Sequence, residues 1–398
     1  MDTCGGDTTS PPVLLTNLGA IVTGDPHDPV ARGDTILVED GVITGIGERG
    51  DVPGPADAIV VDADGQEAIP GLIDSHIHPS VGDYTPRTKT HDWLEAYSQA
   101  GVTTAVSQGS WHTGAYPDDR WGMLALATWL TRSFAGYRPG GMKVHGGTVS
   151  LVEGLVEEDF ALLKGEGTWL IAEVGSRSIV DPETVRGMLE VAHGLGFVSR
   201  VHFGPEAVPG TYTVSAAMAA VMGAHIASHV NGGPSTPPEA DLDFMVEEQD
   251  CFLELSYPGN HRALLRVAER ARDLGMLHRL TAGSDTPTGS GIQPRAIMQT
   301  VGLLAAFLDI PAAQAVAVGT GNTAASYRLN TGRLEVGREA DVLLIDSPRG
   351  SSGTGGLHAL ELGDSPSVSL LMIDGRIVSV GTRNTLPPKR RPVVTVPS

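Results

Sequence analysis

Short apolar runs recur along the whole chain, but the residues that separate them change in character twice. From residue 13 to about 69 the runs alternate with polar residues and are broken by turn signals such as Asp40-Gly41. This alternation predicts a region of short β-strands. The end of the chain has the same texture, because residues 374–381 (DGRIVSVG) echo residues 40–47 (DGVITGIG). We therefore expect the two chain ends to form one small β-domain.

Between these ends, short apolar runs alternate with helical stretches in eight successive units. Strands followed by helices in this way predict a parallel sheet closed into a (β/α)8 barrel. The predicted fold class is α/β, a TIM-like barrel with a small β-sandwich domain formed from both chain ends. The predicted segments are a flexible leader at 1–12, sandwich parts at 13–69 and 331–385, the barrel at 70–330 and a C-terminal tail at 386–398.

Composition and charge narrow the functional class. The chain has 398 residues, 41% of them hydrophobic and 19% charged, as expected of a globular protein. Lys and Arg number 27 against 47 Asp and Glu, and the resulting net charge of -20 would repel nucleic acid and anionic membranes. Cys4 and Cys251 offer no disulfide framework, and the sequence shows neither a secretory signal nor an apolar run of about 18 residues. We expect a cytoplasmic protein that acts on a small molecule.

A His-x-His motif lies where the first barrel strand ends, at His76 and His78. Residues two apart in a strand face the same side, so both imidazoles can point into the barrel mouth and share one metal ion. Alone the motif is weak evidence, because paired histidines also occur in ordinary polar strand ends.

Four further polar residues strengthen the metal hypothesis, because each ends another barrel strand. Active sites of this barrel are built from the C-terminal ends of its strands, so all six side chains are expected to converge on one face. The alternative is that they are unrelated polar residues that cap strands. The six candidates are His76, His78, Glu173, His202, His229 and Asp285.

These residue types suit two divalent ions, because imidazole and carboxylate are ligands of Zn²⁺ and Fe²⁺. We expect the His-x-His pair and Asp285 to hold one ion and His202 with His229 to hold the other. Glu173 would bridge the two ions with one oxygen on each.

The motifs around these residues resemble those of the amidohydrolase superfamily, namely PGLIDSHIH, VHFG, SHVNGG and GSDTP. The resemblance covers nearly the whole length and implies a barrel with a β-sandwich made from both ends. Most binuclear hydrolases of the superfamily bridge their metals with a carboxylated lysine on strand four, where this chain has Glu173. The segments GDYTPRTKT, GMKVHGGTVSLVEGL, GTGNTAASYRLNTG and RNTLPPKR together resemble the enamidase-like subgroup, which opens a cyclic unsaturated amide. The sequence departs from that subgroup at 203–210 and 255–262.

The resemblance implies a hydrolase that cleaves a C–N bond of a small cyclic amide. Two ions lower the pKa of a shared water and supply hydroxide near neutral pH. Asp285 would accept the proton and deliver it to the leaving nitrogen. The resemblance also implies zinc, with iron possible at one position, and a homo-oligomer such as a tetramer. Other activities on the same centre (imidase, deaminase, linear amide hydrolase or isomerase) and a catalytically silent scaffold remain as alternatives.

Substrate contacts are expected from five residues. Lys143 and His145 share one face of the third barrel strand; His145 would steady the tetrahedral intermediate, and Lys143 would hold a substrate carboxylate. A core histidine and a buried ion pair with the site carboxylates are the respective alternatives. Phe203 and Tyr257 follow strands five and seven and would line the pocket, although Tyr257 fits a core position equally well. Arg87, after strand one, would attract an anionic substrate unless it is simply solvated.

Overall fold

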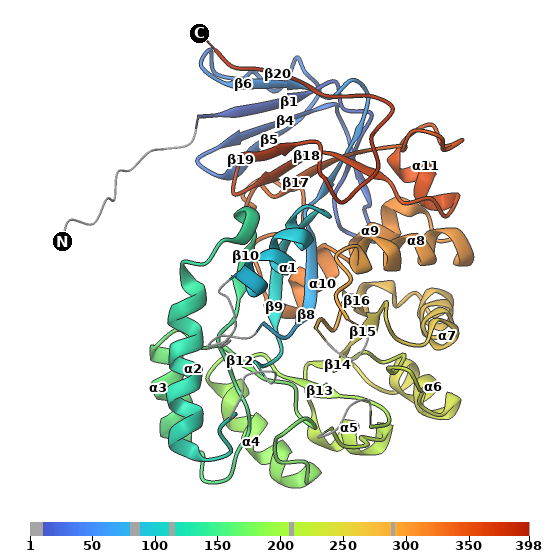
Figure 1. The fold of residues 1–398 in the computed structure, drawn as a ribbon. Helices are drawn as coiled ribbons and strands as arrows, with labels where there is room; N and C mark the ends of the chain where they lie inside the picture. The colour runs from blue at the N-terminus through green and yellow to red at the C-terminus, as the bar shows by residue number, and fades with distance from the viewer. Residues whose placement is uncertain (1–10, 80–87, 111–115, 207–210, 288–290, 398) are drawn as a thin grey trace, which may run out of the picture.

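The computed structural model describes residues 11–397, except 80–87, 111–115, 207–210 and 288–290. Two parts are stacked in Figure 1, with the β-strands of both chain ends above and the helices and parallel strands of the central region below. No helix of the described segments is both long and apolar enough to cross a membrane.

The upper part is a β-sandwich of two mixed sheets. One sheet has the strand order β20-β6-β1-β4-β5 and the other β19-β18-β17-β7-β2-β3. A separate hydrophobic cluster that includes Leu15, Ile36, Leu344 and Leu370 draws on both chain ends. The expectation that both ends build one β-domain is thus confirmed. The strands are β1 (Val13–Thr16), β2 (Ala20–Val22), β3 (Val30–Ala31), β4 (Thr35–Glu39), β5 (Val42–Gly47), β6 (Ile59–Asp62), β7 (Glu67–Pro70), β17 (Val342–Asp346), β18 (Ser367–Ile373), β19 (Arg376–Val380) and β20 (Val393–Thr395).

The two Asp-Gly pairs noticed in the sequence form equivalent hairpin turns. Asp40 and Gly41 have φ of 49° and 80°, and Asp374 and Gly375 have φ of 48° and 72°. Positive φ at both central residues matches the right-handed twist of the flanking strands. The turns lie against each other, since a Cβ on Gly375 would come within 2.8 Å of the Gly41 Cα.

The segment expected to be a C-terminal tail, 386–398, is part of the sandwich. Its residues form β20, which pairs antiparallel with β6. Arg390 in this segment also pairs with the buried carboxylate of Asp346 at 2.6 Å. An exposed polar stretch such as PPKRRP gives no periodic signal for an edge strand, and the expectation of a tail is corrected. Of the predicted leader at 1–12, residues 1–10 lie outside the described residues.

The lower part is a parallel barrel whose strands close into a ring. The third strand is split in two, so that β10 pairs with β9 and β11 pairs with β12. Parallel bridges at Leu170–Val198 and Ile77–Thr286 join the remaining edges of the ring. The predicted TIM-like barrel is therefore confirmed. The strands are β8 (Leu72–Ile77), β9 (Val102–Ser107), β10 (Lys143–His145), β11 (Thr148–Val149), β12 (Leu170–Ile171), β13 (Arg200–His202), β14 (Ile226–Ser228), β15 (Phe252–Ser256) and β16 (Leu280–Gly283).

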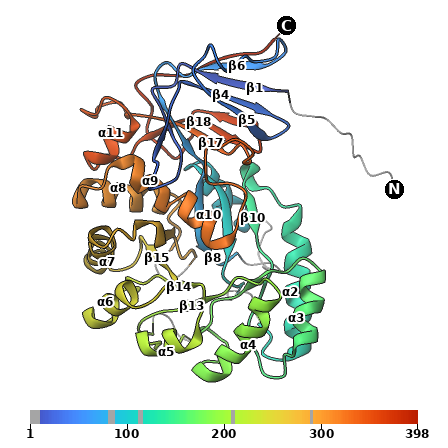
Figure 2. The ribbon, with the colours of Figure 1, turned by 180° about the vertical axis from the view of Figure 1, so that it is seen from behind.

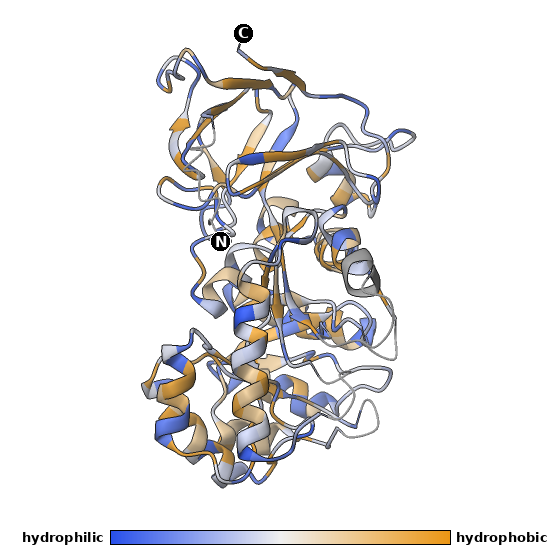
Figure 3. Ribbon diagram, turned by 60° about the vertical axis from the view of Figure 1, so that its left-hand side comes forward, coloured by the Kyte–Doolittle hydropathy of each residue, from blue (hydrophilic) through white to orange (hydrophobic). Residues whose placement is uncertain are grey.

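Helices surround the barrel, as Figure 2 shows from behind. The α4 helix illustrates their patterning: Asp181 caps its first turn, and Val185, Leu189 and Ala192 face the core at helical spacing. Hydrophobic residues run along the strands of both parts (Figure 3). The helices are α1 (Thr88–Ser98), α2 (Arg120–Ala135), α3 (Glu157–Gly165), α4 (Pro182–Gly194), α5 (Ala216–Met222), α6 (Glu239–Glu247), α7 (His261–Asp273), α8 (Ala296–Leu308), α9 (Ala312–Val318), α10 (Gly321–Tyr327) and α11 (Gly356–Glu361), with 3-10 turns at Pro139–Gly141 and Leu277–Arg279.

Candidate metal centre

The six ligand candidates gather at the C-terminal ends of the barrel strands, in two groups of three. His76 lies near the end of β8, and His202 is the last residue of β13. The other four lie just beyond a strand end. Within each group one ligand atom from every residue lies within 4.8 Å of the others. The groups, which we call the His76 group and the Glu173 group, are His76 with His78 and Asp285, and Glu173 with His202 and His229.

The His76 group has the dimensions of one face of a metal tetrahedron. The Nε2 atoms of His76 and His78 are 3.0 Å apart, and Asp285 Oδ1 is 3.2 Å from each. Ligands about 2.0 to 2.1 Å from a tetrahedral ion are about 3.3 Å from one another. Three atoms at these separations can therefore share a single small cation.

The outer nitrogens of this histidine pair determine where the protons are. His76 Nδ1 lies 2.7 Å from Glu254 Oε1, and His78 Nδ1 lies 2.9 Å from the carbonyl oxygen of Gly109. Both partners are acceptors, so each Nδ1 carries a proton, and in the neutral rings both Nε2 atoms present lone pairs to the same point. Two facing lone pairs at this distance repel each other unless a cation lies between them. The residues therefore fit a divalent metal ion.

The Glu173 group has a similar geometry, but His202 turns its Nδ1 rather than its Nε2 towards the other ligands. His202 Nε2 lies 3.1 Å from the carbonyl oxygen of Pro205, so its proton is held there and Nδ1 is the free lone pair. That Nδ1 is 3.1 Å from His229 Nε2, which is also 3.1 Å from Glu173 Oε1. The three atoms surround one point, as a metal site requires.

The electrostatic field at His76 and at His229 favours positive charge. Burial alone would lower the pKa of His229, but the carboxylates of Glu173, Asp285 and Glu254 outweigh it and raise this pKa to about 9. Burial likewise opposes protonation of His76, yet Glu254 and Asp285 raise its pKa above the usual value. Burial makes an imidazolium costly. The same carboxylates would also attract a divalent cation bound between the neutral rings.

The two groups are neighbours, and their residues differ in access to solvent. The rings of His76 and His229 stack with centroids 5.7 Å apart, which brings the two candidate ion positions close together. The side chain of Asp285 is 22% exposed, whereas that of His76 is fully buried. Of the six candidates, Asp285 is thus the one that a bound substrate can reach most directly.

The sequence analysis missed the buried charged residues that surround the candidate metal ligands. Glu254 in β15 and Arg200 in β13 are fully buried charged side chains that pair with each other. Asp74 is buried too; burial raises its pKa to about 6, and its Oδ1 accepts from the backbone N–H of His76. A signal was present, because Arg200 precedes His202 by two and must face the same side, and a glutamate interrupts the otherwise apolar strand around Glu254.

The structure places Lys143 at the wrong end of the barrel for the predicted substrate contact. Its Nζ lies 2.6 Å from Glu339, 2.7 Å from Asp341 and 3.1 Å from Asp374, all in or next to the sandwich domain. The carbonyl of Asp341 in turn accepts from Gly71 N, before the start of β8, whereas His76 and His78 lie at the other end of that strand. Lys143 joins the two domains, and its expected roles at the site are corrected.

His145 follows the same strand and lies below the site rather than in it. Its ring packs edge-on against Trp169, 5.5 Å between centroids, where β12 begins. Burial and then the charge of Lys143 lower the pKa of His145 to about 4, so it is neutral at physiological pH. Nothing among the described contacts of His145 reaches the two metal groups, and its predicted catalytic role is corrected to a place in the barrel interior.

The remaining substrate candidates have different outcomes. Phe203 is 1% exposed and belongs to the main hydrophobic core, since its neighbour His202 takes the inward direction and successive strand residues alternate. Its predicted pocket role is therefore corrected. Tyr257 is half-buried beyond β15, with its ring 4.9 Å from that of His261, and its role stays a prediction. Arg87 lies outside the described residues.

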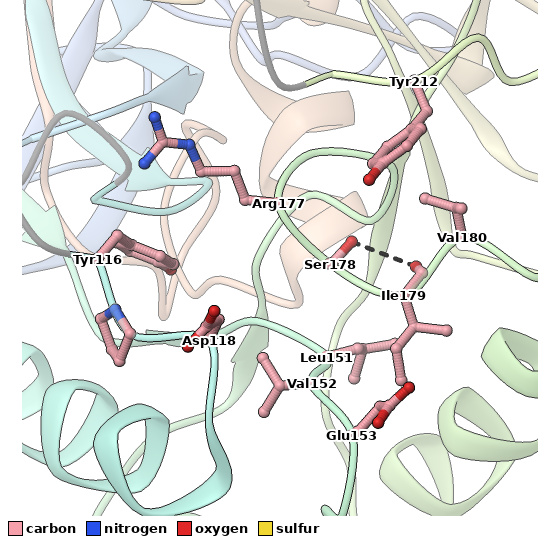
Figure 4. Close-up of a pocket in the computed structure, with 11 residues that line it drawn as sticks. Tyr116, Asp118, Leu151, Val152, Glu153, Arg177, Ser178, Ile179, Val180 and Tyr212 are labelled. Atoms are coloured by element: carbon pink, nitrogen blue, oxygen red, sulfur yellow. Dashed lines mark hydrogen bonds between the residues drawn. The ribbon is translucent and has the colours of Figure 1, made fainter.

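A cavity of about 520 Å³ opens on the same face of the barrel. The loops that follow β9, β11, β12 and β13 form it, and Figure 4 shows Arg177 and Tyr116 across from Tyr212. Arg177 has a positive φ of 46° and follows Ser176, whose hydroxyl lies 3.5 Å from Glu173 Oε2. The cavity therefore lies next to the Glu173 group, although none of the six ligand candidates lines it.

Comparison with known proteins places this site in a family. Residues 251–378 match the profile of the Amidohydrolase family. Over 377 residues the chain is 41% identical to a curated relative, covering 95% of this chain and 98% of that protein. The chain therefore belongs to the amidohydrolase family. That relative is the enamidase of Eubacterium barkeri.

Other relatives agree with this assignment. The crystal structure of an enamidase, described as a member of the amidohydrolase superfamily, superposes with a TM-score of 0.92 at 40% identity and covers 96% of this chain and 100% of its own. An imidazolonepropionase of Salinispora arenicola is 25% identical over 385 residues, covering 84% of this chain and 92% of that protein. The predicted family and the class of enzyme, an amidohydrolase, are confirmed. Membership of this family implies the use of divalent metal, for which the two groups are the candidate ligands.

Proposed function

We propose that this enzyme hydrolyses the amide bond of a small cyclic amide in the manner of an enamidase, with two divalent ions at its centre. The observation that carries the proposal is the pair of three-residue groups, each with its potential ligand atoms within 4.8 Å of one another. Similarity to the Eubacterium barkeri enamidase over 95% of this chain supports the choice of substrate class.

Zinc at one or both positions is the proposed metal, with iron as the other candidate, because the ligands are imidazole nitrogens and carboxylate oxygens. The His76 group would hold one ion, and His202 with His229 the other. Glu173 is the proposed bridge, since its carboxylate lies beside His229 and its charge also acts on His76.

The chain supplies positioning and proton transfer around this centre. Divalent ions held by these residues would supply a water of lowered pKa and would polarise the amide carbonyl. Burial raises the pKa of Asp285, but His76, His78 and His229 outweigh burial and lower it, so this carboxylate is ionised at neutral pH. Asp285 Oδ1 faces the two histidines, and the partly exposed carboxylate is placed to take the proton from the attacking water and give it to the leaving nitrogen.

Substrate is expected to arrive from the open side of the barrel mouth. Tyr257, half-buried where β15 ends, is proposed to line the path, and the cavity beside Arg177 extends this face away from the centre.

The direct test is turnover of 6-oxo-1,4,5,6-tetrahydronicotinate by protein of measured metal content. We expect loss of the conjugated enamide absorbance with release of an aldehyde and ammonia. Asp285→Asn should reduce kcat by about 100-fold or more, since a general base typically contributes 10²–10⁴-fold. Arg186→Ala, in an exposed ion pair on α4, is the matched control. Full turnover by Asp285→Asn would contradict the proton-transfer role.

Two further properties stay proposals. We propose a homo-oligomer, a tetramer as one possibility, because Trp121 and Trp129 are 70% and 50% exposed on one face of α2, an unusual place for two large apolar side chains. Light scattering of the purified protein tests this. A cytoplasmic location, expected from the scarcity of cysteine, can be tested by cell fractionation.

A further inference from the structure

Glu254 accepts four donors at the base of the site, two on each oxygen. Its Oε1 is 2.7 Å from His76 Nδ1 and 3.1 Å from the backbone nitrogen of His229. Its Oε2 accepts from Ser75 Oγ and from the guanidinium of Arg200. One carboxylate oxygen therefore touches one residue from each of the two metal groups.

The surroundings of Glu254 keep it charged and immobile. Glu254 and Arg200 are both buried, with side chains 0% and 1% exposed, and Arg200 also donates to the Ser75 carbonyl at 3.1 Å. Arginine stays protonated in proteins, so its partner carboxylate stays ionised. With four donors around it, Glu254 has no freedom to turn.

We propose that Glu254 is a positioning residue that fixes the proton of His76 on Nδ1 and ties the two metal groups together, with Arg200 as its counter-charge. The inference rests on the proposed function, because it assumes that His76 Nε2 is a metal ligand. Outer carboxylates commonly fix the tautomer and orientation of ligand histidines. Here the same oxygen also holds His229, whose positive φ of 31° is a backbone conformation that needs support.

The position of the donors makes Glu254→Gln a sharp test. A glutamine amide has the same shape but must aim its NH₂ at one of the two donor pairs. The oxygen is expected to face Arg200, because a charged guanidinium is a stronger donor than the His229 backbone N–H, and imidazole can move its proton from Nδ1 to Nε2. The proton on Nε2 then points at His78 and Asp285 and blocks the ligand atom. The isosteric change is thus expected to impair metal binding without creating a cavity.

The experiment measures metal content and affinity by titration of the full-length protein with Zn²⁺, apart from any assay of turnover. Wild type is expected to hold two ions. Glu254→Gln should hold one ion, with the other bound about 10- to 100-fold more weakly, as for lost outer-shell partners generally. Glu254→Asp keeps the charged acceptor and should retain both ions with a smaller loss of affinity. Asp346→Asn makes the same carboxylate-to-amide change beside Arg390 in the sandwich and should bind as wild type does.

The outcomes separate this inference from the proposed function. Wild type without two ions would overturn both. Two ions in wild type and unchanged binding by Glu254→Gln would overturn the inference alone, and so would equal losses in Glu254→Gln and Glu254→Asp. If Glu254→Gln does not fold, nitrogen-15 NMR of metal-free wild type at a pH where the His76 ring is neutral decides: a proton on Nδ1 supports the proposal, and the opposite tautomer overturns it.

Discussion

His76 and His78 aim their Nε2 atoms at each other across 3.0 Å while both outer nitrogens are held by acceptors. In the neutral rings no proton is available to join the two Nε2 atoms, so the site is incomplete without a cation. The fold thus holds the two Nε2 lone pairs in a repulsive arrangement, and a bound ion or an added proton removes that repulsion. Stability and metal binding should be linked for this reason.

Removal of metal is expected to destabilise the protein as well as to abolish turnover. A ligand that binds only the folded state at about 1,000 times its dissociation constant adds about 4 kcal/mol to the free energy of unfolding. We expect thermal denaturation of chelator-treated protein at a clearly lower Tm, with recovery when Zn²⁺ is added back. An identical Tm with and without metal would show that neither group binds an ion in the folded protein.

Glu173→Gln should lose metal and activity together, because an amide cannot supply a charged bridge. We expect kcat to fall by about 100-fold or more, with fewer ions per chain in elemental analysis. Glu166→Gln is a suitable control, since Glu166 lies at the end of α3 and pairs with the exposed Arg132. Wild-type metal content in Glu173→Gln would exclude the bridging role.

Lys143→Met should weaken the fold and leave catalysis alone. The change leaves the fully buried Asp341 carboxylate without its cation, and breaking a buried ion pair in this way costs about 3 kcal/mol. Urea denaturation measures that loss, and KM should stay within about twofold of wild type. A large rise in KM with unchanged stability would return Lys143 to the substrate site.

Stability should fall in mild acid, and His145 should contribute to the fall. Burial, and then Lys143, hold the pKa of His145 at about 4 in the folded protein against 6.5 when the residue is solvated. Between these values the unfolded chain binds the extra proton, so this contribution is complete above pH 6.5 and is lost as the pH drops towards 4. One such group gives at most about 1.4 kcal/mol per pH unit.

His145→Gln should flatten this dependence in denaturation curves measured between pH 4 and 7. Its kcat at neutral pH should remain close to that of wild type, because the imidazole lies away from both metal groups. A kcat loss of about 100-fold with an unchanged acid profile would favour the catalytic role instead.

The architecture and the six ligand candidates could be predicted because they follow local rules. Strand ends are visible in the apolar runs, and the barrel brings all C-terminal strand ends to one face. This rule predicted that His76 and Asp285, 209 residues apart in the sequence, lie close together in the structure. The Asp-Gly turns at Asp40 and Asp374 were equally local signals.

The other site residues could not be placed by the same rules. Lys143 faces inward as predicted, but only the assembled sandwich shows that three carboxylates meet it at the opposite end of the barrel. Phe203 could have been excluded, since alternation along the strand sends it away from His202. The glutamate in an apolar strand marked Glu254 as unusual, but its four donors could not be inferred, because they come from separate strands and loops.

Anomalous diffraction from crystals of the metal-loaded protein at the zinc absorption edge tests the central claim most directly. The account predicts two peaks, one among His76, His78 and Asp285 and the other among Glu173, His202 and His229, with the Glu173 carboxylate between them. Loaded crystals with no peak at either group, or with metal bound only elsewhere on the protein, would contradict it.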